Sequence, residues 1–158
     1  MLLRSKIEWR GIKLHYIAHP EFSKNNLLVS KALDVARDLG NVPVLIHTGE
    51  WDRCHAAVFE GIIKENPDLQ FVLAHGRPID ETISVMKSFP NAWTDTAFMC
   101  GENINRLKEE GLTKRVMFGS DTPINKLYFK ELSTNEYLRK IVTEIKFIDP
   151  TILSHTIY

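Results

Sequence analysis

The stretches VLIHTGE (residues 44–50), FVLAHG (71–76) and VMFGSDTP (116–123) share one pattern, in which a short apolar run stops at a polar residue followed by small turn residues. The residues at which the three runs stop are His47, His75 and Asp121. In a barrel of parallel strands, functional side chains lie at the C-terminal ends of the strands. The three stretches therefore predict two imidazoles and one carboxylate at the same end of a β/α structure.

Short apolar runs alternate with amphipathic segments along the whole chain, and this alternation predicts five β-α units. The expected strands are residues 11–16, 43–47, 70–75, 91–95 and 115–120. The expected helices are residues 25–39, 52–65, 79–88, 102–110 and 135–147. The apolar runs are too short and too uniform to alternate in polarity, as expected for strands that are covered on both faces.

Five units in 158 residues correspond to a little over half of a closed (β/α)8 barrel, which typically needs about 250 residues. The alternative is an open doubly wound sheet, which binds ligands where the strand order reverses. The segment after the first expected strand, residues 18–24, has no glycine-rich phosphate loop. We therefore expect a single α/β domain over residues 1–158, folded as a partial TIM barrel.

The composition excludes several classes of partner. Lys and Arg number 20, Asp and Glu number 20, and the formal net charge is zero, so bulk electrostatics do not recruit nucleic acid or an anionic membrane. The first residues lack the apolar segment of a signal peptide, and no apolar run approaches a membrane-spanning length. We expect a cytoplasmic protein whose two cysteines, Cys54 and Cys100, are reduced.

Each of the three strand-end residues has a chemical and a structural interpretation. A neutral imidazole can bind a divalent ion through one ring nitrogen, and it can equally be a hydrogen-bonded core residue. The carboxylate of Asp121 can bind a metal and accept a proton from bound water, or it can form a turn before Pro123. Because the pattern occurs three times in succession, a shared site is the favoured interpretation.

The motifs IHTG, AHG and FGSDTP, in this order and preceded by GIKLH, resemble those of the amidohydrolase-2 group of the amidohydrolase superfamily. The resemblance runs from about residue 8 to residue 153 and corresponds to the fourth to eighth strands of a metal-dependent TIM-barrel hydrolase or decarboxylase. It implies that His47 is a metal ligand, that His75 is an acid/base or a second metal ligand, and that Asp121 is a ligand that activates water. Zinc is the expected cofactor, with manganese as the alternative.

The sequence also departs from the family. The H-x-H pair on the family's first strand, which supplies two metal ligands, has no counterpart, and only ten residues precede the first expected strand. We therefore expect the C-terminal portion of a barrel with two open sheet edges. Such a surface predicts a homo-oligomer or pairing with a complementary N-terminal half.

Five residues near the expected strand ends are candidates for contact with a small-molecule substrate: Lys13, His15, Glu50, Trp51 and Arg77. Lys13 and His15 alternate along one strand, so their side chains are expected on the same side. Glu50 and Trp51 follow the first histidine motif, and Arg77 follows the second, where it could bind a substrate carboxylate or cap the next helix. Asp95, at the end of the weakest strand, is expected to be structural.

Three functions are compatible with these features. The leading hypothesis is a metal-dependent hydrolase or decarboxylase of small organic substrates, in which metal-activated water reacts, Asp121 accepts a proton, and His75 donates one or stabilises negative charge. The second is a non-catalytic partial barrel that self-associates or pairs with a missing half. The third is a TatD-like metal-dependent nuclease, which also carries His, His and Asp at its strand ends. The zero net charge and the residues of the HTGE and GSDTP motifs disfavour it.

Overall fold

The computed structural model describes residues 8–23, 25–49 and 51–155. Five parallel strands form one sheet in the order β1-β2-β3-β4-β5. The strands are β1 (Ile12–Leu14), β2 (Val44–His47), β3 (Phe71–Ala74), β4 (Ala92–Asp95) and β5 (Val116–Met117). Because each strand pairs with the next one along the chain, the strand order never reverses in the described residues, and this excludes the doubly wound alternative.

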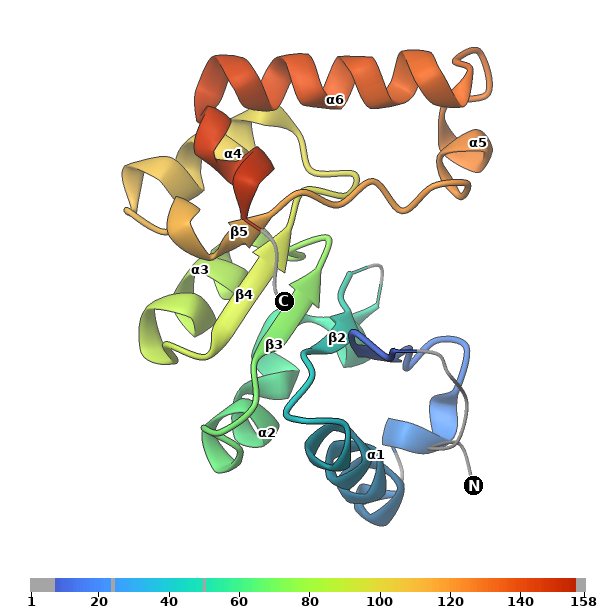
Figure 1. Cartoon of the computed structure of the whole chain (residues 1–158), viewed down its shortest axis with the longest axis vertical. Coiled ribbons are helices and arrows are strands. Elements are labelled where there is room, and N and C mark those ends of the chain that lie inside the picture. The colour runs from blue at the N-terminus through green and yellow to red at the C-terminus, as the bar shows by residue number, and fades with distance from the viewer. Residues whose placement is uncertain (1–7, 24, 50, 156–158) are drawn as a thin grey trace.

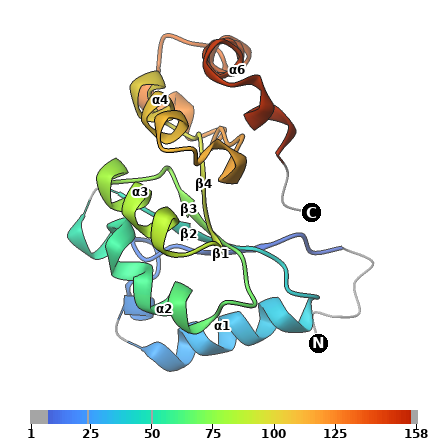
Figure 2. The same ribbon diagram turned by 90° about the vertical axis from the view of Figure 1, so that its left-hand side faces the viewer.

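Helical segments follow the strands. The α-helices are α1 (Asn26–Asp38), α2 (Glu60–Glu65), α3 (Ile79–Ser88), α4 (Gly101–Glu109), α5 (Asn125–Tyr128) and α6 (Thr134–Ile148). The 3-10 turns are η2 (Pro20–Ser23), η3 (Asp52–Cys54), η4 (Ala56–Phe59), η5 (Thr113–Arg115) and η6 (Pro150–Ser154). Helices α1 to α4 follow the outer side of the row of strands in chain order (Figure 1), and α4 packs beside α6 at the end away from α1 (Figure 2). This arrangement confirms the expected partial β/α barrel.

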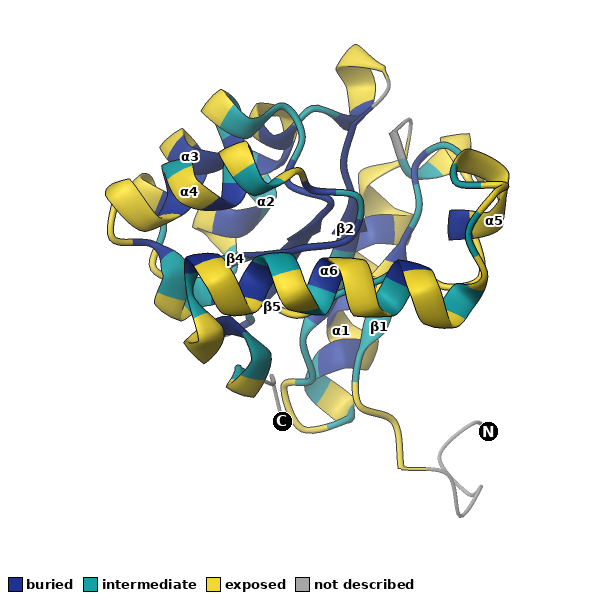
Figure 3. Cartoon of the chain, turned by 90° about the horizontal axis from the view of Figure 1, so that it is seen from above, coloured by how far each residue is buried: buried dark blue, intermediate teal, exposed yellow. Residues whose placement is uncertain are grey.

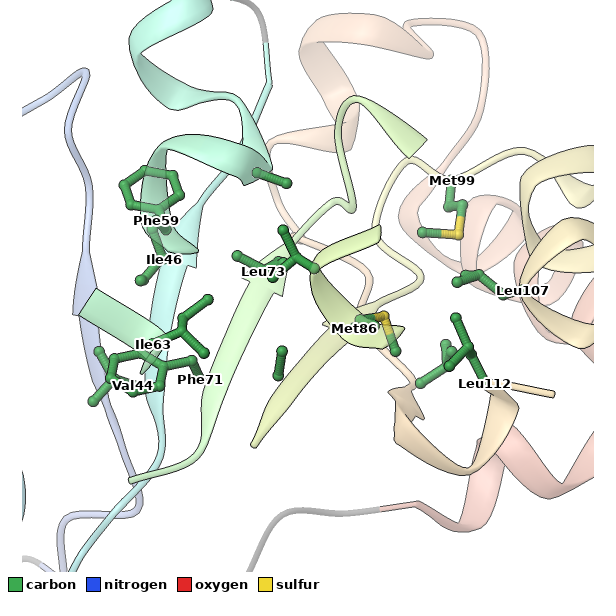
Figure 4. Close-up of a cluster of buried hydrophobic side chains, with 14 of the residues drawn as sticks. Val44, Ile46, Phe59, Ile63, Phe71, Leu73, Met86, Met99, Leu107 and Leu112 are labelled. Atoms are coloured by element: carbon green, nitrogen blue, oxygen red, sulfur yellow. The ribbon is translucent and has the colours of Figure 1, made fainter. Parts of the chain in front are cut away.

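The hydrophobic core lies between the sheet and these helices. The strand register places Val44, Phe71 and Ala92 side by side, and all three are fully buried. The helices contribute further fully buried side chains, among them Ile63, Met86, Ile104 and Leu107. Figure 4 shows this packing around the central strands. Coverage on both faces, as the apolar runs predict, is complete at β3, whose four residues are all buried.

The prediction of one helix over residues 52–65 is wrong for the first half of this range. Two 3-10 turns, η3 and η4, precede a short α2. His55 between the turns has an extended backbone (φ −66°, ψ 146°), and the Ala56 N–H donates to the Arg77 carbonyl over 3.2 Å. This tertiary hydrogen bond takes the place of a bond within the helix, and it ties the segment to the end of β3.

The strand expected over residues 115–120 is confirmed only at Val116–Met117. Beyond it, the Thr96 hydroxyl donates to the Gly119 carbonyl and accepts from the Gly119 N–H, each over 3.1 Å. These bonds to a side chain replace a backbone ladder, so the chain leaves the sheet early. Helix α5, which was not expected from the sequence, follows.

The last expected helix, residues 135–147, is confirmed as α6 with one more residue at each end. Ser133 is its N-cap, and Ser133 and Glu136 form a capping box. Buried and exposed bands alternate along α6 (Figure 3), which is the pattern of a helix packed on one side. Within the described residues, no helix combines the length and apolar character needed to cross a lipid bilayer.

Candidate functional site

A cavity of about 650 Å³ lies at the C-terminal ends of the strands. The residues predicted from the sequence that line it are Lys13, His15, His47, Trp51, His75, Arg77 and Asp121. Glu50, the remaining candidate, lies outside the described residues. The structure therefore brings together, around one cavity, the candidates from three separate motifs and from the first strand.

A second cavity, of about 710 Å³, lies between α1 and the η4–α2 segment and is lined by Tyr16, Phe22, Leu33 and Phe59 among others. It contains none of the predicted site residues. Although it is slightly larger, it lies against the outer helices rather than at the strand ends. The strand-end cavity is therefore the candidate site.

The backbone turns at the strand ends explain how His75 reaches the cavity. In the β2–β3 register His47 pairs with Ala74, so His75 is one residue further along and would face the opposite side in a regular strand. Instead His75 has a left-handed backbone with φ 74°. Phe98 (φ 57°) and Asp121 (φ 49°), which also line the cavity, share this conformation. It costs a non-glycine residue about 1–2 kcal/mol, and such strain clusters at functional sites.

The two histidines form a directional hydrogen-bond chain. His75 Nδ1 lies 3.3 Å from the Ala97 carbonyl oxygen, and His75 Nε2 lies 3.2 Å from His47 Nδ1. A carbonyl oxygen can only accept, so Nδ1 of neutral His75 carries the hydrogen and Nε2 accepts one from His47. Burial, reinforced by the neighbouring His47, lowers the pKa of His75 to about 4. His75 is therefore neutral at physiological pH.

His15 extends this row of imidazoles. Its ring stacks on that of His47, with the ring centroids 4.2 Å apart and the planes 9° from parallel. The Ala18 N–H donates to His15 Nδ1 over 3.3 Å, which places the hydrogen of neutral His15 on Nε2. Burial, followed by the effect of His47, lowers the pKa of His15. The expectation that Lys13 and His15 lie on the same side is met, since both line the cavity.

Charged groups lie at the margin of the cavity. Lys13 Nζ is 3.8 Å from Asp121 Oδ1, and their side chains are 41% and 26% exposed. The Arg77 guanidinium lies 6.0 Å from the centre of the Phe98 ring, and the Arg77 side chain packs so closely on Gly49 that a Cβ there would lie 2.7 Å from Arg77 Cδ. Apart from the imidazoles, the described lining has two cations, Lys13 and Arg77, and one anion, Asp121, a balance that suits an anionic ligand.

Asp95 lies outside the cavity lining and holds two backbone segments beside the cavity. It is buried, and its Oδ1 accepts the backbone N–H of His75 over 3.0 Å and that of Ala97 over 2.9 Å. Burial raises the pKa of Asp95 to about 6 against the lowering effect of these two hydrogen bonds. The structural role expected for Asp95 stays an interpretation. These bonds indicate that the groups it would hold are the His75 and Ala97 backbones.

Phe98 is one of the cavity residues that sequence reasoning missed, and the others are Ile17, Ile124, Tyr128 and Phe129. The Phe98 ring lies 5.8 Å from that of His75 and 5.2 Å from that of Tyr128. A phenylalanine in a loop carries no periodic signal, and only its left-handed backbone marks it. The loop after β4 therefore contributes an aromatic wall to the site.

The donor types in the cavity, imidazole and carboxylate, suit zinc, but their arrangement does not form a closed site. The two imidazole nitrogens contact each other, and the Asp121 carboxylate faces Lys13. In the part of the chain that the structure describes, no group of three or more His, Cys, Asp or Glu is placed to hold a metal ion. The assignment of His47, His75 and Asp121 as metal ligands stays a prediction.

Comparison with solved structures identifies relatives in fold. A probable 2-pyrone-4,6-dicarboxylic acid hydrolase from Acinetobacter baumannii, with citric acid bound, superimposes with a TM-score of 0.64 at 14% identity, covering 90% of this chain and 60% of the other. A protein from Pseudomonas putida assigned to the same activity gives a TM-score of 0.56 at 14% identity, covering 85% and 56%. This chain thus spans less than two thirds of the length of these structures.

Sequence comparison gives a second, independent result. No curated protein matches the chain. The family model for amidohydrolases, in contrast, matches residues 5–146, which is most of the chain and includes all three strand-end motifs. On this match, the chain belongs to the amidohydrolase family.

Proposed function

We propose that this chain carries active-site residues of a hydrolase or decarboxylase that acts on a small organic carboxylate. The observation that carries the proposal is the convergence of three imidazoles, two cations and one carboxylate on the strand-end cavity. Membership of the amidohydrolase family supports the reaction class. The Acinetobacter baumannii structure of the same fold is a probable dicarboxylic acid hydrolase with citric acid bound, which supports the ligand class.

The cavity itself favours a flat, negatively charged substrate. Its volume of about 650 Å³ lies within the usual range of small-molecule pockets, about 300–1,000 Å³. Lys13 and Arg77 provide the cations that would bind carboxylate groups, Arg77 with the geometry for two parallel hydrogen bonds. The rings of Trp51, Phe98 and Tyr128 line the same cavity and would pack on an unsaturated ring or chain.

The polar residues have complementary parts in the proposed hydrolysis. A water oxygen bonds to the substrate carbonyl carbon while Asp121 takes the proton that the water loses. A proton passes to the leaving group from the His47–His75 pair, and Asp121 returns its proton to that pair. Because His75 is neutral, its Nε2 can take over the hydrogen that His47 Nδ1 donates to it, so the pair can pass on a proton.

We also propose that a divalent metal, zinc before manganese, serves as cofactor. His47, His75 and Asp121 are the donors that this chain offers, and a bound metal would supply a Lewis acid. Loading requires the His47–His75 and Lys13–Asp121 contacts to open, or further donors from outside the described residues. Elemental analysis after dialysis against a mild chelator tests this: about one metal per chain, lost in His47→Ala, is expected, and no retained metal contradicts it.

The reaction class is tested by turnover of unsaturated lactone carboxylates, beginning with 2-pyrone-4,6-dicarboxylate, and of small unsaturated carboxylic acids that can lose carbon dioxide. Absorbance follows both reactions, with and without zinc or manganese. Asp121→Asn and His75→Gln should each lower turnover by about 100-fold or more, because each removes an acid/base group. Arg77→Met should instead raise KM about tenfold by removing one charged hydrogen-bond partner.

His19→Gln is the matched control. His19 is exposed, its Nδ1 lies 3.4 Å from Glu21 Oε1, and it is not part of the cavity lining. This variant should keep wild-type turnover. Undiminished turnover in both Asp121→Asn and His75→Gln, or the absence of any binding or turnover across the carboxylate panel, would contradict the proposed function.

The same preparation separates the alternatives. Cleavage of an activated phosphodiester, in the absence of carboxylate turnover, would favour the nuclease. Folded protein without any turnover would favour a non-catalytic partial barrel. We propose self-association or pairing with a complementary N-terminal half as the way in which the two sheet edges are covered, and sedimentation of the chain alone measures the former.

A further inference from the structure

One oxygen of Asp95 links two segments that surround the site. Asp95 Oδ1 accepts the backbone N–H of His75 at the end of β3, over 3.0 Å, and the backbone N–H of Ala97 beyond β4, over 2.9 Å. Asp95 is 7% exposed, so these bonds lie away from solvent. The carboxylate therefore fixes the distance between the ends of the two strands.

Both the backbone and the imidazole ring of His75 depend on Asp95 Oδ1. The His75 backbone, strained at φ 74°, is held through its own N–H by Asp95. The His75 imidazole is held through Nδ1 by the carbonyl of Ala97, over 3.3 Å. Ala97 is itself held by Asp95. Removing the acceptor would release the backbone turn and the ring partner together.

The segment just beyond β5 packs against the Asp95 carboxylate. Gly119, just beyond β5, lies so near that a Cβ there would be 2.9 Å from both Cβ and Cγ of Asp95. Thr96 holds Gly119 by two hydrogen bonds of 3.1 Å. Asp95 is not part of the cavity lining. Asp95 therefore does not itself contact a ligand in the cavity, and its direct contacts are with the residues it holds.

We infer that Asp95 is a positioning residue, which keeps His75 in its left-handed turn and selects the imidazole nitrogen that faces His47 and the cavity. With Nδ1 directed at Ala97, Nε2 is the nitrogen that meets His47. The effect on turnover rests on the proposed function. The effect on the His75 ring and backbone does not.

Nitrogen NMR of the ¹⁵N-histidine-labelled chain and amide hydrogen exchange test this inference. In the wild type, His75 should be a single tautomer with its hydrogen on Nδ1. Asp95→Leu, which removes the acceptor at similar volume, should give a mixture of tautomers. Asp95→Asn keeps an oxygen but loses the charge. Relative to wild type, the increase in exchange rate should be about tenfold larger for the His75 and Ala97 amides than for the neighbouring Gly76 amide.

Thr94→Val is the matched control. Thr94 lies next to Asp95 on β4, is fully buried, and its hydroxyl donates to the Leu73 carbonyl over 2.7 Å. This variant loses a buried hydrogen bond in the same strand, yet it should leave the His75 tautomer unchanged. A His75 tautomer that shifts equally in Thr94→Val would show a general loosening of the strand and contradict the inference.

The remaining outcomes are also decisive. If Asp95→Leu does not fold, unchanged exchange of the His75 and Ala97 amides in Asp95→Asn overturns the inference. Where a substrate is turned over, the folded Asp95 variants should lower kcat and leave KM within about twofold, because they misplace an acid/base group without touching substrate. If the Asp95 variants show the expected NMR changes but the chain turns over no substrate, the proposed function is contradicted and the inference about Asp95 is not.

Discussion

The central and the outer strands hold their functional side chains in different ways. His47 and His75, at the ends of β2 and β3, are 8% and 3% exposed and hydrogen-bonded to each other. Lys13 of β1 and Asp121 beyond β5 have side chains 41% and 26% exposed, joined by one ion pair of 3.8 Å. A central strand has a neighbour on both sides, so its end is enclosed, whereas an outer strand in this sheet has a neighbour on one side only.

This difference separates two tasks within one site. The imidazoles of His47 and His75 are fixed before any ligand arrives, because hydrogen bonds determine their orientation, and burial keeps His75 neutral by lowering its pKa. Lys13 and Asp121 at the margin are partly exposed and can exchange partners at little cost. Changes at the centre should therefore affect stability first, and changes at the margin should affect ligand binding first.

The largest expected effect is on the central strand itself. Phe71→Ala removes a fully buried ring between Val44 and Ala92 and should lower the free energy of unfolding by about 3–5 kcal/mol. Met117→Ala, at a half-buried position of β5, should lower it by about 1 kcal/mol. Urea denaturation measures both. Equal losses would break the distinction between central and outer strands.

The neutral state of His75 gives the next largest effect. Its pKa is about 4 in the folded chain and about 6.5 when unfolded, so between these pH values the unfolded chain binds more protons. Relative to His75→Gln, the wild type should lose about 3 kcal/mol of unfolding free energy as the pH falls from about 6.5 to 4. Taking the difference between the two proteins removes most of the opposite contribution of Asp95, which both retain. A difference that does not change with pH would show that folding does not lower the pKa of His75.

A pair of glycine substitutions sharpens the comparison further. Gly76 (φ 57°) and Gly111 (φ 70°) are both left-handed, but a Cβ at Gly76 would lie 2.6 Å from Met99 Cε and 2.8 Å from Thr94 Oγ1. A Cβ at Gly111 would have no neighbour within 4 Å. Gly111→Ala should therefore cost about 1 kcal/mol and Gly76→Ala about 2–3 kcal/mol. Thermal unfolding measures the two costs, and equal values would mean that the centre tolerates repacking.

The smallest effect on stability is expected at the margin. Asp121→Asn should change the free energy of unfolding by less than about 1 kcal/mol, because the ion pair with Lys13 is long and partly exposed. Asparagine also accepts the left-handed backbone of this position, which removes strain as a second cause. Urea denaturation of Asp121→Asn and Lys13→Met should place both near the wild type. A loss above about 2 kcal/mol would make the margin part of the scaffold.

The sequence alone determined the central sheet and the chemical character of the site. The runs that end at His47 and His75 form β2 and β3 because they are apolar enough to be buried on both faces, a property of local composition. The capping box of Ser133 and Glu136 is likewise local, since both partners lie within one turn of α6. The motif around Asp121 also placed this residue at the same cavity as the two histidines.

Only the tertiary structure decided how these residues are held. The expected helix over residues 52–65 breaks because Ala56 bonds to the carbonyl of Arg77, and β5 ends early because Thr96 captures Gly119. His75 enters the cavity through a left-handed turn that Asp95 stabilises from the next strand. Apolar periodicity reports how a segment meets the core, but these hydrogen bonds join residues about 20 positions apart, and only the folded chain brings them within reach.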